Sequence, residues 1–168
     1  MVGTHEKERK QRMEEQGIFI ERILSNENMN RAYKQVKKNK GAAGIDGMEW
    51  ADLLSHLKVN GQQLRESIRN QSYKPMPVKR VEIPKADGSK RKLGIPTVTD
   101  RVVQQATAQV LTPIYERKFH ENSYGFRPGK SAQKAVLKAV KYMNEGYNWV
   151  VDIDLEKFFD MVEHDKLI

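Results

Sequence analysis

Apolar residues recur three or four positions apart early in the chain, and this spacing predicts a helix. From Glu27 the stripe continues into a basic run that ends at Gly41, where a glycine is expected to stop the helix. Ser25 and Asn26 precede the stripe and are candidates for its N-cap. The stripe consists of Met29, Ala32, Tyr33 and Val36.

Further apolar stripes at helical spacing follow and are typical of core packing. The dipeptide Asn60-Gly61 lies between two of them, so separate stripes are expected before and after it. Thr99 is the expected cap of a later, long helix, and Ser131 is the expected cap of the next one. The stripes consist of Trp50, Leu53, Leu54 and Leu57; Leu64 and Ile68; Val102, Val103, Ala106, Val110, Leu111 and Ile114; and Ala135, Val136, Val140 and Tyr142.

The periodicity changes to two in residues 77–96. Val81 and Ile83 alternate with charged residues, Asp87-Gly88 is a turn dipeptide, and Leu93 and Ile95 occupy alternate positions beyond it. The pattern predicts a β-hairpin with one apolar face and one basic face.

Residues 147–155 are rich in aromatic and β-branched side chains, a composition typical of a strand. A helix start follows this segment. Helices, a hairpin and a strand together predict an α+β fold, and the chain shows no internal repeat and no linker that divides it in two.

Charge is distributed unevenly along the 168 residues, which hold 30 Lys+Arg and 22 Asp+Glu for a net charge of +8. Residues 31–92 hold 15 basic and 6 acidic side chains, residues 93–148 hold 8 and 4, and residues 149–168 hold 2 and 6. A basic body attracts polyanions through counterion release, which favours nucleic acid as a partner. The alternative is a solvated surface with surplus lysine.

Composition excludes several classes of protein. The sequence has no cysteine, so a disulfide scaffold, a thiolate zinc site and a cysteine nucleophile are excluded. It has no apolar run near the roughly 18 residues of a membrane helix and no recognisable export signal, so no membrane partner is expected. The expected location is the cytoplasm of a bacterium, or another reducing compartment.

Two carboxylates in the acidic end suggest metal chemistry. Asp152 and Asp154 lie on one face of the expected strand, because strand side chains alternate. Magnesium takes one or two protein carboxylates and completes its shell with water and phosphate oxygens, and such ions support in-line phosphoryl displacement. The alternative is that these side chains only cap the helix that follows.

The hairpin offers a complementary anion site. Lys85 and Arg91 flank the turn and are placed to approach one anion from two sides, with Arg supplying a planar donor fork and Lys a point charge. The alternative is a basic hairpin that binds no ligand.

Five ordered stretches together resemble the group II intron reverse transcriptases, or intron maturases: GAAGIDG, RVEIPKADGSKRKLGIPT, DRVVQQA, YGFRPGKSAQKAV and VVDIDLEKFFD. The resemblance spans residues 18–168. It implies an RNA-directed DNA polymerase, a nucleotidyltransferase that extends a primer on an RNA template from dNTPs with two Mg2+ ions. It also implies the fingers and the first strand of a polymerase palm, and group II intron RNA as a partner.

The resemblance assigns roles to individual residues. Asp154 matches the first catalytic aspartate, a ligand of both magnesium ions, and the Leu155 carbonyl matches the backbone ligand beside it. Phe159 matches the aromatic gate against a 2′-hydroxyl, and Lys85 and Arg91 match the residues that hold the triphosphate. The implied nucleic-acid contacts are Lys79 and Arg80 on the hairpin, Ala42, Ala43, Gly44 and Ile45 in a lid over the template, and Phe126, Arg127, Pro128 and Gly129 in a loop near template and primer.

The remaining acidic-end residues fit the family less closely. Asp152 is interpreted as a supporting or capping carboxylate, because the distance to the aromatic gate fits only when counted from Asp154. His164, beside Asp165, is interpreted as a surface residue at a helix end and not as a proton shuttle.

The implied layout has a charged, disordered leader (1–16), an N-terminal extension with the lid (17–48), fingers (49–122) and the junction with the palm (123–168). The family completes its metal site with an aromatic-x-Asp-Asp turn, which this sequence lacks. The expectation is therefore a truncated polymerase that binds RNA but is inactive alone. The alternatives are a non-catalytic module that recognises intron RNA and, less favoured, a basic architectural or ribosome-associated protein. Splicing activity and a homodimer are left open.

Overall fold

The computed structural model describes residues 17–155 except residue 87, together with residues 158 and 161–163. The expected leader, Phe159, His164 and Asp165 lie outside the described residues. The chain divides into two compact units, Met1–Lys118 and Phe119–Ile168, although the sequence shows no obvious linker. The elements in chain order are α2 (Asn26–Asn39), α3 (Leu53–Arg69), β1 (Lys79–Pro84), β2 (Lys90–Ile95), α4 (Val98–Glu116) and α5 (Ala132–Asn144).

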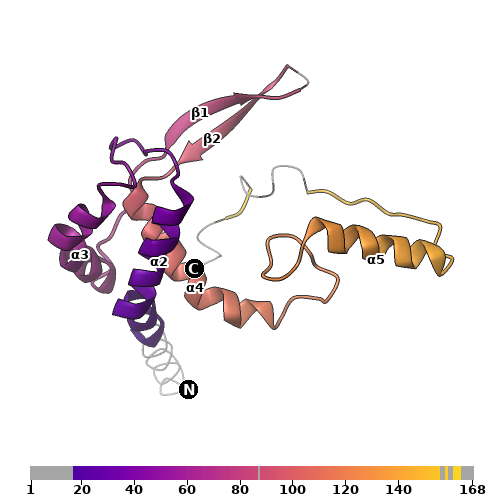
Figure 1. Cartoon of the computed structure of the whole chain (residues 1–168), viewed down its shortest axis with the longest axis horizontal. Helices are drawn as coiled ribbons and strands as arrows, with labels where there is room; N and C mark the ends of the chain where they lie inside the picture. Colours follow the sequence, from indigo (N-terminus) through magenta and orange to yellow (C-terminus); the bar gives the residue numbers. More distant parts are fainter. Residues whose placement is uncertain (1–16, 87, 156–157, 159–160, 164–168) are drawn as a thin grey trace, which may run out of the picture. The chain divides into compact units, whose positions relative to one another are not determined.

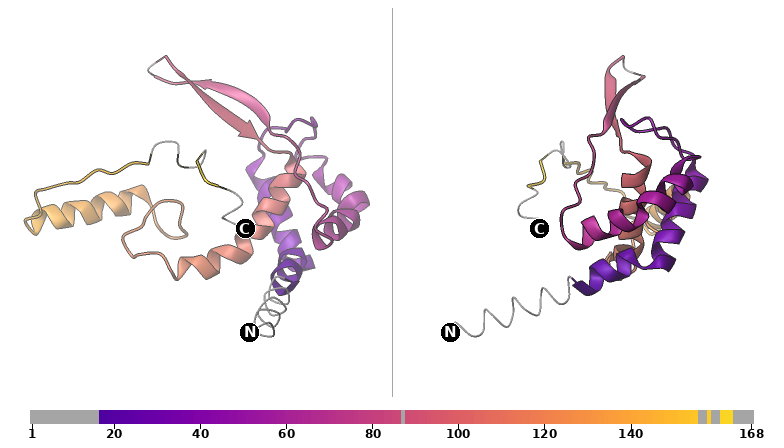
Figure 2. Two further views of the ribbon diagram at one scale, coloured as in Figure 1. Left: turned by 180° about the vertical axis from the view of Figure 1, so that it is seen from behind. Right: turned by 90° about the vertical axis from the view of Figure 1, so that its left-hand side faces the viewer.

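The helices α2, α3 and α4 of the first unit lie close together in Figures 1 and 2, and together with residues 17–24 they supply its buried core. Residues 17–24 are helical, and α2 packs against α4. As predicted, the Ser25 side chain caps α2 by accepting from the Asn28 amide. The helix ends one residue before the expected stop at Gly41, with Lys40 in the left-handed conformation. The buried cluster consists of Leu24, Met29, Ala32, Val36, Leu53, Val98, Val102 and Ala106.

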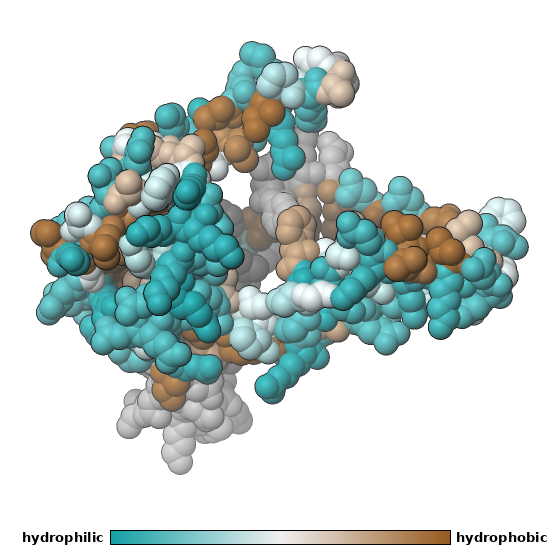
Figure 3. Space-filling model, viewed as in Figure 1, coloured by the Kyte–Doolittle hydropathy of each residue, from teal (hydrophilic) through white to brown (hydrophobic). Residues whose placement is uncertain are grey.

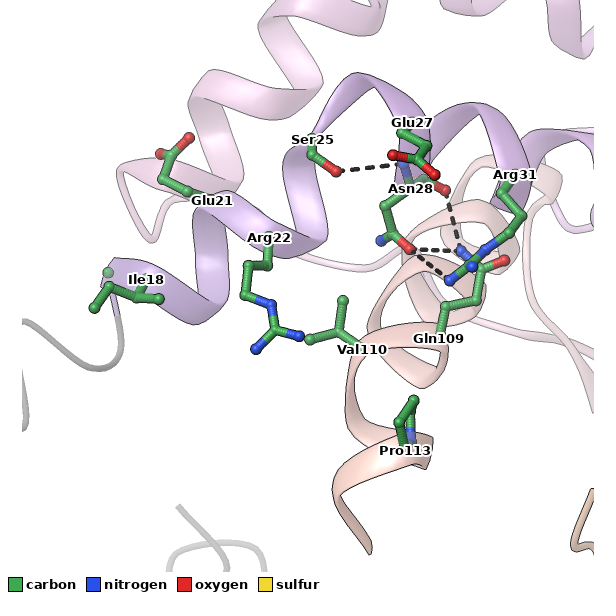
Figure 4. A pocket seen from close by; sticks show the side chains of 11 residues that line it. Ile18, Glu21, Arg22, Ser25, Glu27, Asn28, Arg31, Gln109, Val110 and Pro113 are labelled. Carbon is green, nitrogen blue, oxygen red and sulfur yellow. Dashed lines mark hydrogen bonds between the residues drawn. The ribbon is translucent and has the colours of Figure 1, made fainter. Parts of the chain in front are cut away.

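A buried amide fixes the register of α2 on α4. The Asn28 Nδ2 group donates to the carbonyls of Ile23 and Ala106, each at 2.9 Å. Its Oδ1 atom accepts from Gln109 Nε2 at 2.8 Å, a contact visible in Figure 4. Because both protons and the oxygen of this amide have partners, the burial of a polar group in the core is compensated.

The helix α3 corrects the expectation of two separate stripes. It runs without a break through Asn60 and Gly61. A glycine inside a helix costs about 1 kcal/mol, less than the packing of an apolar face contributes. Leu57 and Leu64, on either side of the dipeptide, both pack against the buried cluster, so tertiary contacts override the local break signal.

The cap of α4 lies two residues earlier than expected. Thr97, not Thr99, is the N-cap, and its side chain accepts from the Asp100 amide. The Thr99 hydroxyl is buried and has no hydrogen-bond partner among the described residues. No described helix, α4 included, is long and apolar enough to cross a membrane.

The hairpin forms as predicted, and β1 pairs with β2 in antiparallel register. Val81 lies opposite Leu93 and Ile83 lies opposite Arg91. The turn is closed by a hydrogen bond of 2.7 Å from the Lys85 amide to the Ser89 carbonyl. Gly88 adopts φ 81°, a left-handed conformation that glycine takes without steric cost.

The second unit contains α5 and an extended segment. Ser131 caps α5 as predicted, with its hydroxyl accepting from the Lys134 amide, yet none of the helix residues is buried. The expected strand at 147–155 does not form. A strand requires a neighbour that bonds its backbone groups, and no described segment pairs with this one. Trp149 is 96% exposed and Val150 is 86% exposed, which fits an unpaired segment.

Candidate nucleotide and nucleic-acid interface

The hairpin places Lys85 and Arg91 on the same face. Arg91 lies directly opposite Ile83 in the ladder, and Lys85 follows Ile83 by two residues. Because strand side chains alternate, Lys85 and Arg91 are diagonal neighbours across the two strands, within reach of one ligand for long side chains. Long side chains at these two positions can approach one anion from the same face of the hairpin.

The basic side chains of the hairpin are exposed and mostly unpaired. Lys90 forms an ion pair with Glu82 at 2.8 Å. The other basic side chains of the two strands and the turn have no hydrogen bond or ion pair within the part of the chain that the structure describes; they are Lys79, Arg80, Lys85, Arg91 and Lys92. Their charges are therefore available to an anionic ligand.

The expected lid, residues 41–47, is anchored to the start of α4, and it lies beside the base of the hairpin in Figures 1 and 2. Arg101 donates to the Ala42 carbonyl at 2.6 Å. Gly44 is buried so closely against Thr97 that an added Cβ would lie 2.6 Å from the Thr97 Cα. Among the expected contact residues, Ile45 is 52% exposed and Ala42 is exposed, whereas Ala43 is half-buried.

A buried carboxylate anchors the segment that leads into β1. Asp100, near the start of α4, is 4% exposed and accepts from the Tyr73 hydroxyl through Oδ1. Its Oδ2 atom accepts from the Thr97 hydroxyl at 2.6 Å and from the Met76 amide at 3.3 Å. Thr97 to Arg101 therefore hold both the lid and the root of the hairpin.

Electrostatics at this anchor favour a neutral tyrosine. Partial burial of the phenol, reinforced by the hydrogen bond to the Asp100 carboxylate, raises the pKa of Tyr73 well above its usual range. Tyr73 consequently remains a hydrogen-bond donor at physiological pH.

The loop at 123–129 belongs to the second unit. Arg127 donates to the carbonyls of His120 at 2.6 Å and Ser123 at 2.9 Å, and its guanidinium lies 5.2 Å from the centre of the Phe119 ring. Much of its donor capacity is thus used to shape the loop. Phe126 is fully exposed at φ 55°, and Pro128 and Gly129 complete the turn beside it.

Asp154 and Leu155 also lie in the second unit. Asp154 is exposed, and its Oδ1 atom accepts from the Leu155 amide at 3.0 Å. The described residues contain no group of three or more His, Cys, Asp or Glu side chains that could hold a metal. One carboxylate and one carbonyl nevertheless fit a magnesium ion that takes its other ligands from water and phosphate.

A separate groove of about 1010 Å³ lies in the first unit, and its lining side chains are drawn in Figure 4. Arg22 and Arg31 border it together with the apolar side chains of Ile18 and Val110. None of the residues implied by the sequence motifs lines this groove.

Comparison with known proteins identifies the family. Residues 83–168 match the model described as reverse transcriptase (RNA-dependent DNA polymerase). The chain belongs to the reverse transcriptase family. The resemblance to group II intron reverse transcriptases and the α+β fold class are therefore confirmed.

Relatives cover most of this chain. Protein YkfC of Escherichia coli is 40% identical over 132 residues, covering 75% of this chain and 35% of that protein. Group II intron-encoded protein LtrA of Lactococcus lactis is 38% identical over 139 residues, covering 82% of this chain and 23% of that protein. The putative COX1/OXI3 intron 2 protein of Saccharomyces cerevisiae is 33% identical over 144 residues, covering 82% of this chain and 16% of that protein.

The chain thus spans about a third or less of the length of these curated relatives. A chain in a solved Cas6-RT-Cas1–Cas2 complex aligns with a TM-score of 0.49 at 24% identity, covering 88% of this chain and 15% of that chain.

The anchor formed by Asp100 with Tyr73, Met76 and Thr97 was not expected from the sequence. The pattern Thr97-x-x-Asp100 has the spacing of a capping box, with an acidic residue three positions after a threonine, and could have identified the true helix start. The long-range partners Tyr73 and Ala42 carry no comparable local signal. The structure brings the lid and hairpin residues together in the first unit and places Asp154 and the 123–129 loop in the second.

Proposed function

We propose that this chain is the part of a group II intron-type reverse transcriptase that binds the RNA template, the primer and the incoming dNTP. Support comes chiefly from the hairpin, whose Lys85 and Arg91 share one face and lack partners within the described residues. Intron RNA is proposed as a further partner because relatives such as the Lactococcus lactis protein are intron-encoded.

Each hairpin residue has a distinct part in this proposal. Arg91 holds two oxygens of the triphosphate through its guanidinium fork, and Lys85 adds a point charge from the diagonal position. Lys79 and Arg80, nearer the anchored root of the hairpin, contact the nucleic-acid backbone. Alternation puts Lys79 on the face of Lys85 and Arg80 on the other face, so the strand contacts ligands from both sides.

The lid and the loop of the second unit complete the proposed nucleic-acid contacts. Ala42, Ala43 and Ile45 cover the template, and the buried Gly44 allows the lid to lie close against Thr97. The loop residues Phe126, Arg127, Pro128 and Gly129 contact template and primer, with the exposed Phe126 ring available to stack on a base.

Magnesium is the proposed cofactor. Asp154 would hold it through a carboxylate oxygen, together with the Leu155 carbonyl, and Phe159 would exclude a 2′-hydroxyl. When bound, the metal would activate the primer hydroxyl and stabilise the leaving phosphate oxygens. Asp152 supports this segment without binding the metal, so the two aspartates form a matched pair for mutagenesis.

Primer extension tests the proposal. The chain is assayed with labelled primer, RNA template, dNTPs and Mg2+, alone and with a polypeptide that supplies the downstream part of a related reverse transcriptase. We expect RNA binding without extension by the chain alone, because the sequence contains no Asp-Asp pair, and extension when the two parts are combined.

The matched aspartate variants then locate the metal ligand. In the combined protein, Asp154→Ala is expected to slow extension roughly 1000-fold, corresponding to about 4 kcal/mol of lost transition-state stabilisation. Asp152→Ala serves as the control and is expected to change the rate by no more than a few-fold. Equal losses in the two variants would contradict the assignment of Asp154.

A non-catalytic RNA-binding module is the second candidate. Its support is the set of exposed basic side chains on the hairpin, which need no metal to contact phosphates. Under this alternative, Asp154→Ala leaves every activity of the combined protein unchanged and the basic side chains carry the whole function.

A further inference from the structure

The region around α5 is rich in basic side chains, and one of them, the exposed Lys141, pairs with Glu145 at 3.7 Å. Residues 122–144 contain five basic side chains and no acidic one. Three of the five lie on α5 itself, at Lys134, Lys138 and Lys141. These positions are four and three residues apart, so the lysines occupy about 60° of the helix circumference. We call these three residues the lysine stripe.

The opposite side of α5 is apolar, which fixes the outward direction of the lysine stripe. Ala139 and Met143 line a groove with Trp149 and Val151 of the extended segment. Figure 3 shows hydrophobic side chains gathered on one side of α5 and hydrophilic side chains on the other. The helix thus directs its apolar face to the neighbouring segment and its lysines away from it.

Aromatic rings accompany the basic side chains of this region. Lys138 lies 4.9 Å from the centre of the Tyr142 ring, and Lys130 lies 4.9 Å from the centre of the Tyr124 ring. Lys134 Nζ donates to the Gly129 carbonyl at 2.6 Å, which directs it toward the loop. Both rings are half-buried, and Tyr142 also packs edge-on against Tyr147, so the rings orient the lysines, and the phosphate contacts of the lysines are what a single-stranded nucleic acid would use.

We infer that the lysine stripe is a second nucleic-acid contact surface of this chain, one that takes the phosphate backbone of a single RNA strand. The inference rests on the proposed function, because it assigns the strand to a protein that binds RNA. The roles implied by the five sequence motifs include no contact for these three lysines. The inference therefore adds a contact to those already proposed.

The length of the lysine stripe matches the spacing of phosphates along a nucleic-acid strand. Lys134 to Lys141 spans about 10 Å along the helix axis at a rise of 1.5 Å per residue. A nucleic-acid strand presents one phosphate per roughly 3.4 Å of duplex axis, so the stripe can engage about three phosphates. An acidic protein would be the other polyanion to consider, but its carboxylates do not recur at a fixed interval as the phosphates of a strand do.

Salt dependence of RNA binding tests the inference. Binding of a labelled single-stranded RNA by the full chain is measured by fluorescence anisotropy across a range of salt concentrations. Three proteins are compared: the unaltered chain, Lys134→Gln/Lys138→Gln/Lys141→Gln, and the charge-preserving Lys134→Arg/Lys138→Arg/Lys141→Arg. Loss of three phosphate contacts is expected to make the slope of log K against log[salt] shallower by about 2 in the glutamine variant, and arginine is expected to retain it.

A hairpin variant separates this inference from the proposed function. If Lys79→Gln/Arg80→Gln weakens binding while the stripe variant keeps the affinity and slope of the unaltered chain, the inference is overturned and the proposed function stands. If the unaltered chain does not bind RNA, both are overturned. Loss of binding in the arginine variant as well would assign the stripe to packing and overturn the inference. Single Lys→Gln variants, each expected to change the slope by about 0.7, supply the same test if the triple variant loses helicity.

Discussion

The two units differ in how their proposed binding elements are supported. In the first, the lid and the hairpin attach to α4 through Arg101 and Asp100, and α4 itself carries fully buried residues such as Val98 and Val102. In the second, none of the residues of α5 is buried and the segment at 147–155 is exposed. The first unit therefore has a core that holds its contacts in place, and the second presents contacts on a scaffold with little burial of its own.

The first unit is suited to holding side chains at fixed positions, and the second is suited to binding a strand through charge. A triphosphate clamp needs side chains held at fixed angles, and a buried polar anchor supplies that rigidity. Backbone contacts to a nucleic-acid strand tolerate more freedom because they depend mainly on charge.

Truncation of one leucine in each unit gives the largest contrast. Leu53→Ala removes a fully buried side chain and is expected to lower the free energy of unfolding by about 3 kcal/mol. Leu137→Ala in α5 is the control, because Leu137 is 69% exposed and its truncation is expected to cost less than about 0.5 kcal/mol. Urea denaturation followed by circular dichroism measures both. Equal losses would show that the second unit has a core as tight as the first.

The lid is tested by adding a methyl group. Gly44→Ala places a Cβ 2.6 Å from the Thr97 Cα and 2.8 Å from its nitrogen, so backbone must move. We expect a loss of about 2 kcal/mol in thermal or urea denaturation. If Gly44→Ala proves neutral, the lid is not held against α4 as described.

The buried anchor is tested by Tyr73→Phe, which removes one donor to Asp100. We expect a loss of about 1 kcal/mol at neutral pH. Tyr115→Phe on α4 is the control, because Tyr115 is 50% exposed. Similar losses in the two variants would show that the hydrogen bond from Tyr73 to Asp100 does not stabilise the fold specifically.

Tyr73 is also expected to make the free energy of unfolding depend on pH. The pKa of Tyr73 is raised in the folded protein, so folding favours the neutral phenol. The stabilisation is complete below the ordinary tyrosine pKa of about 10 and decreases as the pH rises above it. Tyr73→Phe should therefore flatten the alkaline decline of stability, and an unchanged decline would contradict the assignment.

The smallest effect is expected to be favourable. Gly61 lies inside α3, and a Cβ added there would meet no atom within 4 Å. Gly61→Ala should raise the free energy of unfolding by about 0.5 to 1 kcal/mol, since alanine is the better helix former. A loss of stability would contradict the open space described around this position.

Features encoded locally were predictable from the sequence. The caps at Ser25 and Ser131 and the hairpin at 77–96 depend on residues close in the chain, and the structure confirms all three. The placement of Lys85 and Arg91 on either side of the turn followed from the same local pattern.

Features that depend on distant partners were not predictable. Thr97 and Thr99 are both plausible caps until the partners of Asp100 are known, and Tyr73 lies 27 residues from that carboxylate. Gly61 signals a break that packing overrides. The segment at 147–155 has the composition of a strand, but composition does not supply the neighbour with which a strand must pair.

The central claim is that the hairpin, held in place by Asp100 and its hydrogen-bond partners, binds RNA through basic side chains that have no partner among the described residues. The most direct measurement compares RNA affinity for the unaltered chain and for Lys79→Gln/Arg80→Gln between about 50 and 200 mM salt. The account predicts weaker binding at every salt concentration and a log–log slope shallower by about 1.4, as two phosphate contacts on a single strand require. Identical affinity and slope in the two proteins would contradict it.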